Sequence, residues 1–116
     1  MRLQGTTIEV RDLAAAKAFY ETLLGLEPGE FYEPTKWQPY SVGDAYFAIR
    51  EVPGCARHDA LDITNFDVQD VEDLWNRVRE PAHVLEPLDM TPYGTYKFVI
   101  ADPSGYRLGF VGTKRS

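Results

Sequence analysis

Two carboxylate residues, Glu9 and Asp67, occupy matching positions in two similar short blocks of the sequence. The blocks are residues 8–13 (IEVRDL) and residues 66–71 (FDVQDV), and each reads apolar, acidic, valine, polar, aspartate, apolar. Two carboxylates that face one cavity can hold a cation or hydrogen-bond donors, and can act in general acid–base catalysis. Glu9 and Asp67 are therefore the candidate catalytic residues. The alternative is that both are solvent-exposed strand ends beside helix N-termini, where negative charge is favoured.

The spacing of these blocks indicates an internal duplication. They are separated by half of the chain's 116 residues, and each joins a β-like run to a helical run. Repetition at a fixed spacing is typical of a repeated structural unit. We therefore predict one domain over residues 1–116, made of two βαβββ modules at about 1–53 and about 60–113, with residues 53–60 as the connection. The alternative is a coincidental similarity between two strand-to-helix junctions.

Two helices with clear start signals are predicted. Asp12 and Asp70 are favourable N-cap residues, because an aspartate side chain accepts hydrogen bonds from free backbone N–H groups. Apolar residues then recur at helical spacing until Gly25 ends the first helix and Pro81 stops the second. Strands are predicted from β-branched and aromatic runs between turn residues. They cover residues 6–10, 30–33, 36–42, 45–52, 62–68, 84–88, 96–101 and 106–111.

Strand alternation assigns side chains to opposite faces of each predicted sheet. Ile8 and Val10 should pack against the first helix, and Phe66 and Val68 against the second. The opposite faces should then line a shared concavity. The predicted fold class is α+β, with two βαβββ modules forming a cup-shaped mixed sheet backed by two helices. The residues expected to face the cup from the first strands are Thr7, Glu9, Asn65 and Asp67.

Composition and charge exclude several classes of function. The net charge of −6 disfavours nucleic acid as a partner, because an acidic surface repels phosphate. No apolar run approaches the ~20 residues of a membrane span, and the N-terminus lacks an apolar signal core, so we predict a cytoplasmic protein with no membrane partner. The single cysteine, Cys55, cannot form an internal disulfide. His58 and His83 are distant in sequence and are predicted to be solvated surface residues.

Two sequence blocks resemble the vicinal oxygen chelate superfamily, which includes glyoxalases, extradiol dioxygenases and bleomycin-resistance proteins. Residues 10–13 (VRDL) with residues 19–26 (FYETLLGL) are similar to the family's first strand-to-helix junction and the end of that helix. Residues 102–105 (DPSG) are similar to its final hairpin turn. Two motifs in the expected places of a duplicated chain are more specific than one common turn. The resemblance implies the cup-shaped fold and a homodimer, because related cups often pair or exchange halves.

The resemblance also implies positions for a divalent metal ion, and this sequence lacks ligands there. Metal-dependent members use His, Gln or Glu at positions that match Gly5, Ile63 and Gly109 of this chain. None of these residues carries a side-chain donor, and a divalent ion needs several converging N or O donors. A one-residue slip would present Gln4 and Asp62 instead, but it would turn the apolar neighbours to the wrong face. We therefore predict no metal site and no cofactor.

Recognition of a small organic molecule is the chemistry that remains for the cup. Thr7 and Asn65 could orient a ligand, and Arg107 could bind an anion or pair with a carboxylate. Gly109 leaves room where related metal-binding proteins place a glutamate, so that space is predicted to belong to a ligand.

Aromatic residues make up 13% of the chain, and such residues often hold planar or apolar ligands. Trp37, Phe47 and Tyr93 are the candidates. Phe47 aligns with Gly109 if Gly43 and Gly105 are matched, and Tyr93 lies in a Pro-Tyr-Gly loop.

Three functions are compatible with these residues. The first is a metal-independent protein that binds and sequesters an aromatic or cationic small molecule, as the resemblance to bleomycin- and antibiotic-resistance proteins implies. The second is a divergent glyoxalase- or dioxygenase-like enzyme with Glu9 or Asp67 as the base. The third is an interaction domain whose cup is filled by side chains. Turnover would distinguish the second from the first, and a closed cavity packed with aromatic residues would indicate the third.

Overall fold

The computed structural model describes residues 1–55 and 62–114. The chain forms two compact units, Met1–Ala56 (unit 1) and Arg57–Ser116 (unit 2). His58 and most of the predicted connection lie outside the described residues. Within the described ranges no helix is long and apolar enough to cross a membrane.

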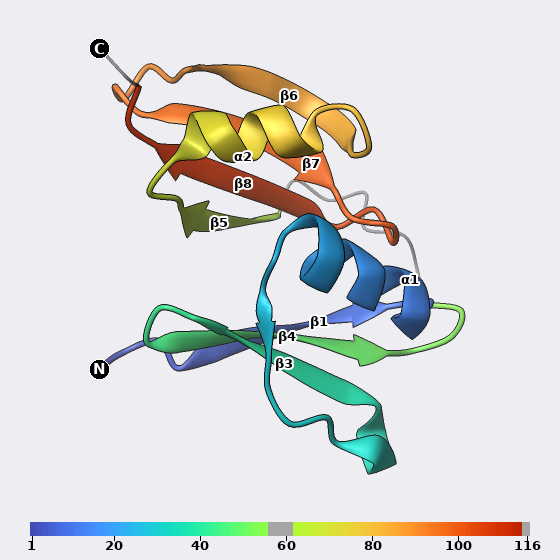
Figure 1. Ribbon diagram of the computed structural model, residues 1–116. Helices are drawn as coiled ribbons and strands as arrows, with labels where there is room; N and C mark the ends of the chain where they lie inside the picture. Colours follow the sequence, from blue (N-terminus) through green and yellow to red (C-terminus); the bar gives the residue numbers. More distant parts are fainter. Residues whose placement is uncertain (56–61, 115–116) are drawn as a thin grey trace. The chain divides into compact units, whose positions relative to one another are not determined.

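Unit 1 is a four-stranded mixed sheet with a helical segment on one face (Figure 1). The strand order is β1-β4-β3-β2, with β1 parallel to β4 and the other neighbours antiparallel. In chain order its elements are β1 (Gly5–Val10), α1 (Leu13–Lys17), η1 (Ala18–Leu23), β2 (Glu27–Pro28), η2 (Glu33–Thr35), β3 (Trp37–Val42) and β4 (Ala45–Glu51).

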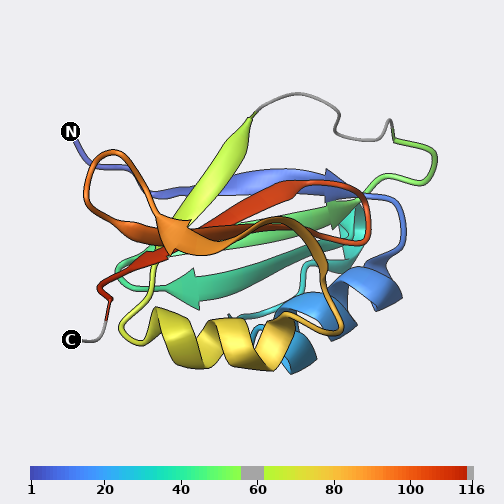
Figure 2. The ribbon, with the colours of Figure 1, turned by 90° about the horizontal axis from the view of Figure 1, so that it is seen from above.

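Unit 2 repeats the same plan. Its strand order is β5-β8-β7-β6, with β5 parallel to β8 and the others antiparallel. Its helix lies across one face of β7 and β8, which Figure 2 shows from a second direction. The α+β prediction with two βαβββ modules is therefore confirmed. The elements are β5 (Ile63–Asp67), α2 (Val71–Val78), β6 (His83–Met90), β7 (Tyr96–Ala101) and β8 (Arg107–Gly112).

Both helices begin where their aspartate caps predict. The Asp12 carboxylate accepts a hydrogen bond from the backbone N–H of Ala15, and the Asp70 carboxylate accepts one from Asp73. Gly25 has a φ of 75°, a left-handed conformation that suits glycine at a helix end. The first helix differs from the prediction in one respect, because after five α-helical residues it continues as the π-helix η1.

Aromatic packing between helix and sheet forms the core of each unit. In unit 1 the Tyr20 ring lies 5.2 Å from Phe47 and 6.0 Å from Tyr40, measured between ring centroids. In unit 2 Phe98 contacts Trp75 of α2 at 5.1 Å and the ring of Phe110, also at 5.1 Å. These contacts place one face of each sheet against the helix of the same unit, and the opposite face, on which the described residues of that unit place no α- or π-helix, is called its helix-free face.

The segment from residue 30 to residue 36 departs from the strand prediction. The short strand β2 lies earlier, at Glu27–Pro28, and a 3-10 turn at Glu33–Thr35 follows. Pro34 suits the start of this turn, since its fixed φ matches the first helical position and its missing N–H is not needed there. Lys36 then adopts a left-handed φ of 53° and brings the chain back into β3. The result is a tight hairpin in place of a regular strand.

Candidate functional site

Three of the side chains that the sequence singles out, Thr7, Glu9 and Trp37, lie on the helix-free face of the unit 1 sheet. Ile8 and Val10 are buried on the other face, as strand alternation predicts. Residues that are paired across strands share a face, so the register assigns the remaining side chains. The helix-free face of unit 1 comprises Gly5, Thr7, Glu9, Trp37, Pro39, Ser41, Tyr46, Ala48 and Arg50.

Trp37 extends across the middle of this face. Its indole N–H donates a hydrogen bond of 3.2 Å to the hydroxyl of Thr7, which lies on β1 with β4 between the two strands. Its ring meets that of Tyr46 edge-to-face at 5.8 Å. On β4 the residue that faces this crossing is Ala48, which is paired with Thr7 and whose small side chain leaves space for the indole. Trp37 and Thr7, two of the candidate residues, are therefore in direct contact.

Phe47 lies on the opposite side of the sheet from its predicted position. It is 2% exposed and packs against Tyr20 of the helix, so it belongs to the core of unit 1. The residue of unit 1 that corresponds to Gly109 is Ala48, since Ala48 pairs with Thr7 as Gly109 pairs with Asn65. The glycine alignment fails because the segment from Gly105 to Gly109 is one residue shorter than the segment from Gly43 to Ala48.

Glu9 is solvent-exposed and lies next to Arg50 in the pairing of β1 with β4. Arg50 in turn pairs with Trp37 across β4 and β3. The predicted direction of Glu9, away from the helix, is therefore confirmed. The same row brings a carboxylate, a guanidinium and an indole to one end of the helix-free face.

At the centre of the helix-free face of unit 2 lie three neighbouring residues, Asn65, Gly109 and Lys97. A Cβ atom added to Gly109 would overlap with the side-chain oxygen of Asn65 and lie 2.9 Å from Cε of Lys97. It would also lie 3.1 Å from the end of the Ile63 side chain. The space beside Gly109 is therefore filled by neighbouring side chains, and the prediction that it is open to a ligand is wrong.

The register relates Lys97 of unit 2 to Trp37 of unit 1. Val99 pairs with Gly109 as Pro39 pairs with Ala48, so Lys97 and Trp37 are in equivalent places on β7 and β3. Trp37 reaches Thr7 of the outer strand, and Cε of Lys97 lies over Gly109 of the neighbouring strand. The two helix-free faces thus have the same layout with different chemistry, aromatic in unit 1 and cationic in unit 2.

The remaining candidate residues of unit 2 are placed by the same pairing. Asp67 is exposed and lies in one row with Val111 and Lys97. Arg107 is half-buried beside Ile63, on the predicted face. Tyr93 lies in the turn between β6 and β7 and is 89% exposed.

The family's metal positions do not fit a divalent ion in this chain. A Cβ atom on Gly5 would overlap with the Tyr46 ring, so an aromatic side chain covers that position. Ile63 offers only an aliphatic side chain, and Gly109 is covered by Asn65 and by Lys97, whose positive charge opposes a cation. Among the described residues there is no group of three or more His, Cys, Asp or Glu side chains that could hold a metal.

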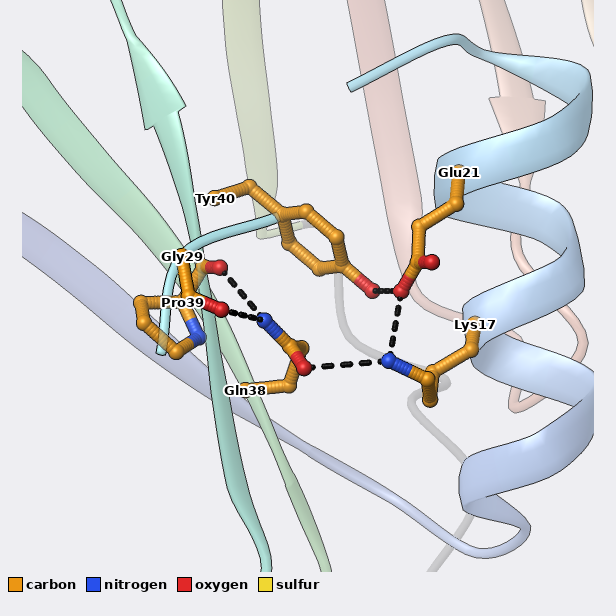
Figure 3. Close-up of polar contacts among 6 residues, drawn as sticks. All are labelled: Lys17, Glu21, Gly29, Gln38, Pro39 and Tyr40. Atoms are coloured by element: carbon orange, nitrogen blue, oxygen red, sulfur yellow. Dashed lines mark hydrogen bonds and ion pairs between the residues drawn. The ribbon is translucent and has the colours of Figure 1, made fainter. Parts of the chain in front are cut away.

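A partly buried polar network lies between the helix and the sheet of unit 1 (Figure 3). Lys17 donates to the Glu21 carboxylate at 2.7 Å and to the Gln38 side-chain oxygen at 3.0 Å. The hydroxyl of Tyr40 donates to the same Glu21 oxygen at 2.8 Å. Gln38 is 2% exposed, and its amide donates to the backbone oxygens of Gly29 and Pro39 at 3.0 and 2.9 Å. The network therefore connects the helix to the segment that leads into the residue 30–36 hairpin.

Electrostatics keep this network in one protonation state at neutral pH. Burial raises the pKa of the Glu21 carboxyl, but the hydrogen bonds from Lys17 and Tyr40 outweigh it, so the pKa lies below its ordinary value of 4.5. Burial raises the pKa of the Tyr40 hydroxyl well above its ordinary value, and the hydrogen bond to Glu21 raises it further. Glu21 is thus an ionised acceptor and Tyr40 a protonated donor.

The residue 30–36 hairpin borders a hollow of about 590 Å³ in unit 1. Its lining combines three aromatic residues with a carboxylate and a proline. Sequence reasoning missed this site because it assigned residues 30–33 to a regular strand and considered Trp37 only as part of the cup. The lining residues are Glu30, Phe31, Tyr32, Trp37 and Pro39.

A second hollow, of about 320 Å³, borders β6 and β7 in unit 2 and is lined mostly by polar residues and prolines. Its charged members are Glu86, Asp89 and Lys97.

The repeated βαβββ plan defines the fold class, and a comparison with models of protein families identifies the superfamily. The family model of the Glyoxalase/Bleomycin resistance protein/Dioxygenase superfamily matches residues 2–110, and the chain belongs to this superfamily. No match was found among curated proteins.

Solved structures share the fold at low sequence identity. A protein of unknown function from Agrobacterium tumefaciens is 22% identical with a TM-score of 0.83, over 98% of this chain and 95% of that one. A lactoylglutathione lyase from Agrobacterium tumefaciens is 22% identical with a TM-score of 0.76, over 96% and 92%. A glyoxalase/bleomycin resistance protein/dioxygenase from Alicyclobacillus acidocaldarius is 18% identical with a TM-score of 0.79, over 98% and 92%. Similarity at this level establishes the fold.

Proposed function

We propose that this protein binds a small organic molecule without a metal ion, using the helix-free face around Trp37. The observation that carries the proposal is the pair of covered positions, Gly5 beneath the Tyr46 ring and Gly109 beneath Asn65 and Lys97. Side chains occupy the places where a metal-dependent relative would present ligands. In unit 1 the group available to a ligand is instead the indole ring of Trp37, which contacts Thr7 and Tyr46.

The geometry of Trp37 supports a binding role. A side chain that is fixed before a ligand arrives loses little conformational freedom on binding. The hydrogen bond to Thr7 and the edge-to-face contact with Tyr46 fix the indole in this way. Glu9 and Arg50 at the end of the face supply polar groups of both signs for orientation. This combination of apolar surface and a few polar groups is typical of small-molecule sites.

The test is a thermal-shift screen of planar and cationic small molecules in buffer with and without EDTA, together with metal analysis of the purified protein. A ligand present at 100 times its dissociation constant adds about 2.7 kcal/mol of stability, which is a shift of several degrees for a domain of this size. We expect hits whose shifts are unchanged by EDTA and are lost in Trp37→Leu. Stoichiometric bound metal, with shifts that EDTA abolishes, would overturn the proposal.

Fluorescence provides an independent readout of the same site. The chain has two tryptophans, and Trp75 packs on Phe98 in unit 2. A Trp75→Phe variant leaves Trp37 as the only indole, so a change in its emission on titration reports binding at the helix-free face of unit 1. A hit that stabilises the protein without changing this emission would place the ligand elsewhere.

An enzyme with Glu9 or Asp67 as the base is the alternative function. The two carboxylates are exposed and face away from the helix of their own units, as a base in a ligand site must. Turnover of a ligand found in the screen, lost in Glu9→Gln or Asp67→Asn while binding persists, would favour this alternative over a binding protein.

A further inference from the structure

The residue 30–36 hairpin and Trp37 form a hollow whose lining has the chemistry of a cation-binding aromatic cage. Three aromatic residues, Phe31, Tyr32 and Trp37, line it together with Glu30 and Pro39. Its volume of about 590 Å³ lies within the range of small-molecule sites. Aromatic rings attract a cation through the negative potential of their faces, and a nearby carboxylate adds a full charge of the same sign.

The backbone holds two of these rings on the same side of the hairpin. Tyr32 and Trp37 are bridge partners, since the Tyr32 N–H donates to the Trp37 oxygen at 2.9 Å and the Trp37 N–H donates to the Tyr32 oxygen at 3.0 Å. Side chains of such a pair project to the same side of the ladder. The indole is fixed further by Thr7 and Tyr46, so the tryptophan wall of the hollow has one orientation.

The other end of the segment is fixed from inside the protein. The Gly29 N–H donates to the Pro39 oxygen at 2.8 Å, and the buried Gln38 amide donates to the backbone oxygens of both residues. Glu30 follows directly after this fixed point. The hollow is therefore held between the Gln38 network and the Tyr32–Trp37 bridge, as a preorganised site requires.

The other charges of the segment do not oppose a cation. Lys36 forms an ion pair with Glu33, which keeps its ammonium group on the turn, and neither residue lines the hollow. The chain as a whole carries a net charge of −6, which attracts cations from a distance.

We propose that this hollow binds an organic cation of the quaternary-ammonium class, with the three aromatic rings around the charged group and Glu30 as the counter-ion. The inference deepens the proposed function and rests on it, because Trp37 takes part in both. It goes further by assigning a ligand class and three residues, Glu30, Phe31 and Tyr32, that the helix-free face does not include.

The test compares choline with 3,3-dimethylbutan-1-ol, a neutral molecule of the same shape, by titrating Trp37 fluorescence in full-length Trp75→Phe protein. We expect saturable binding of choline that is at least about tenfold tighter than that of the neutral alcohol. Tyr32→Leu should weaken choline binding about fivefold to thirtyfold, while Tyr32→Phe, which keeps the ring, should retain it. Glu30→Gln should weaken it about twofold to fivefold and make it less sensitive to salt.

Glu27→Gln is the matched control, because it removes the same charge three positions away from Glu30, at an exposed residue of β2 that does not line the hollow. It should leave choline affinity unchanged. Equal affinity for choline and the alcohol, no effect of Tyr32→Leu, or equal effects of Glu30→Gln and Glu27→Gln would overturn the cage. If neutral compounds bind at Trp37 in EDTA while choline does not, the cation inference fails and the proposed function stands. If nothing binds unless metal is present, the proposed function fails.

Discussion

At the residue scale, the side chain of Gln38 is held by hydrogen bonds at both ends of its amide. It is buried, accepting from Lys17 and donating to the backbone oxygens of Gly29 and Pro39. A buried polar side chain that loses its partners costs about 1–3 kcal/mol, so such a group is stable only when its surroundings are complete. Lys17 and Glu21 complete them on the helix side. The network therefore couples the helix to the wall of the aromatic hollow.

Glu21→Gln tests the charge in this network. The pKa of Glu21 is lowered in the folded protein, so its carboxylate contributes stability above its ordinary value of 4.5, and this contribution is lost as the pH falls through the lower folded pKa. We expect the variant to be about 1 kcal/mol less stable than the parent at pH 7, with the difference shrinking as the pH is lowered below the ordinary value of 4.5 and through the lower folded pKa. Urea unfolding at a series of pH values measures it.

Glu33→Gln is the control variant for these unfolding measurements, because it removes a carboxylate that lies outside the network. Its ion pair with Lys36 is exposed, and exposed pairs contribute little. A stability difference for Glu21→Gln that is independent of pH, or no larger than that of Glu33→Gln, would contradict the role of the charge.

Sequence patterns were informative about the direction of individual side chains and poor at predicting their neighbours. Alternation correctly placed Thr7, Glu9 and Arg107, because a strand has a fixed period of two. It could not show that Lys97 lies over Gly109, since that contact depends on the register between β7 and β8. Phe47 was assigned to the wrong face for a related reason, since one residue of difference between two turns reverses the parity of the strand that follows.

At the element scale, local sequence patterns predict the helix N-caps and most of the strands. They do not predict the π-helix η1 or the 3-10 turn η2. Asp12 and Asp70 act through hydrogen bonds three residues away, which a sequence displays directly. The π-helix η1 has contacts with β3, which lies far along the chain, through Tyr20 and Glu21, and local sequence patterns do not display such contacts. The strand predicted at residues 30–33 failed because Pro34 and Lys36 form a turn there.

Gly112→Ala tests the close approach of β8 to α2. A Cβ atom at this position would lie 2.7 Å from Cβ of Val71 and 2.9 Å from the backbone oxygen of Val68. Neither atom can move unless the start of α2 moves, so we expect a loss of about 1–3 kcal/mol in unfolding free energy. Thermal and urea unfolding measure the loss.

Gly109→Ala is the matched substitution on the other face of the same strand. Its contacts are the ends of the Asn65, Lys97 and Ile63 side chains, which can rotate away. The loss should be smaller, below about 1 kcal/mol. Equal losses at the two positions would show that the side chains over Gly109 are as rigid as the backbone beside Gly112.

At the scale of the whole molecule, we expect a homodimer. Within its own sheet each unit has two outer strands, β1 and β2 in unit 1 and β5 and β6 in unit 2, and sheet edges of this kind are where a strand of a second chain can pair. Light scattering coupled to size-exclusion chromatography should give twice the chain mass of 13.2 kDa. A mass of 13.2 kDa at all concentrations tested would contradict the expectation.

The equivalence of Trp37 and Lys97 has a consequence for how such a protein can diversify after gene duplication. Both positions are built on the same backbone, and the strand beneath each side chain carries a small residue, Ala48 or Gly109. A change of one codon at either position therefore replaces the chemistry of one half and leaves the other half untouched. An ancestor with two identical halves would have carried the same side chain at both positions. This chain instead carries an aromatic ring at Trp37 and an ammonium group at Lys97, on the same backbone arrangement.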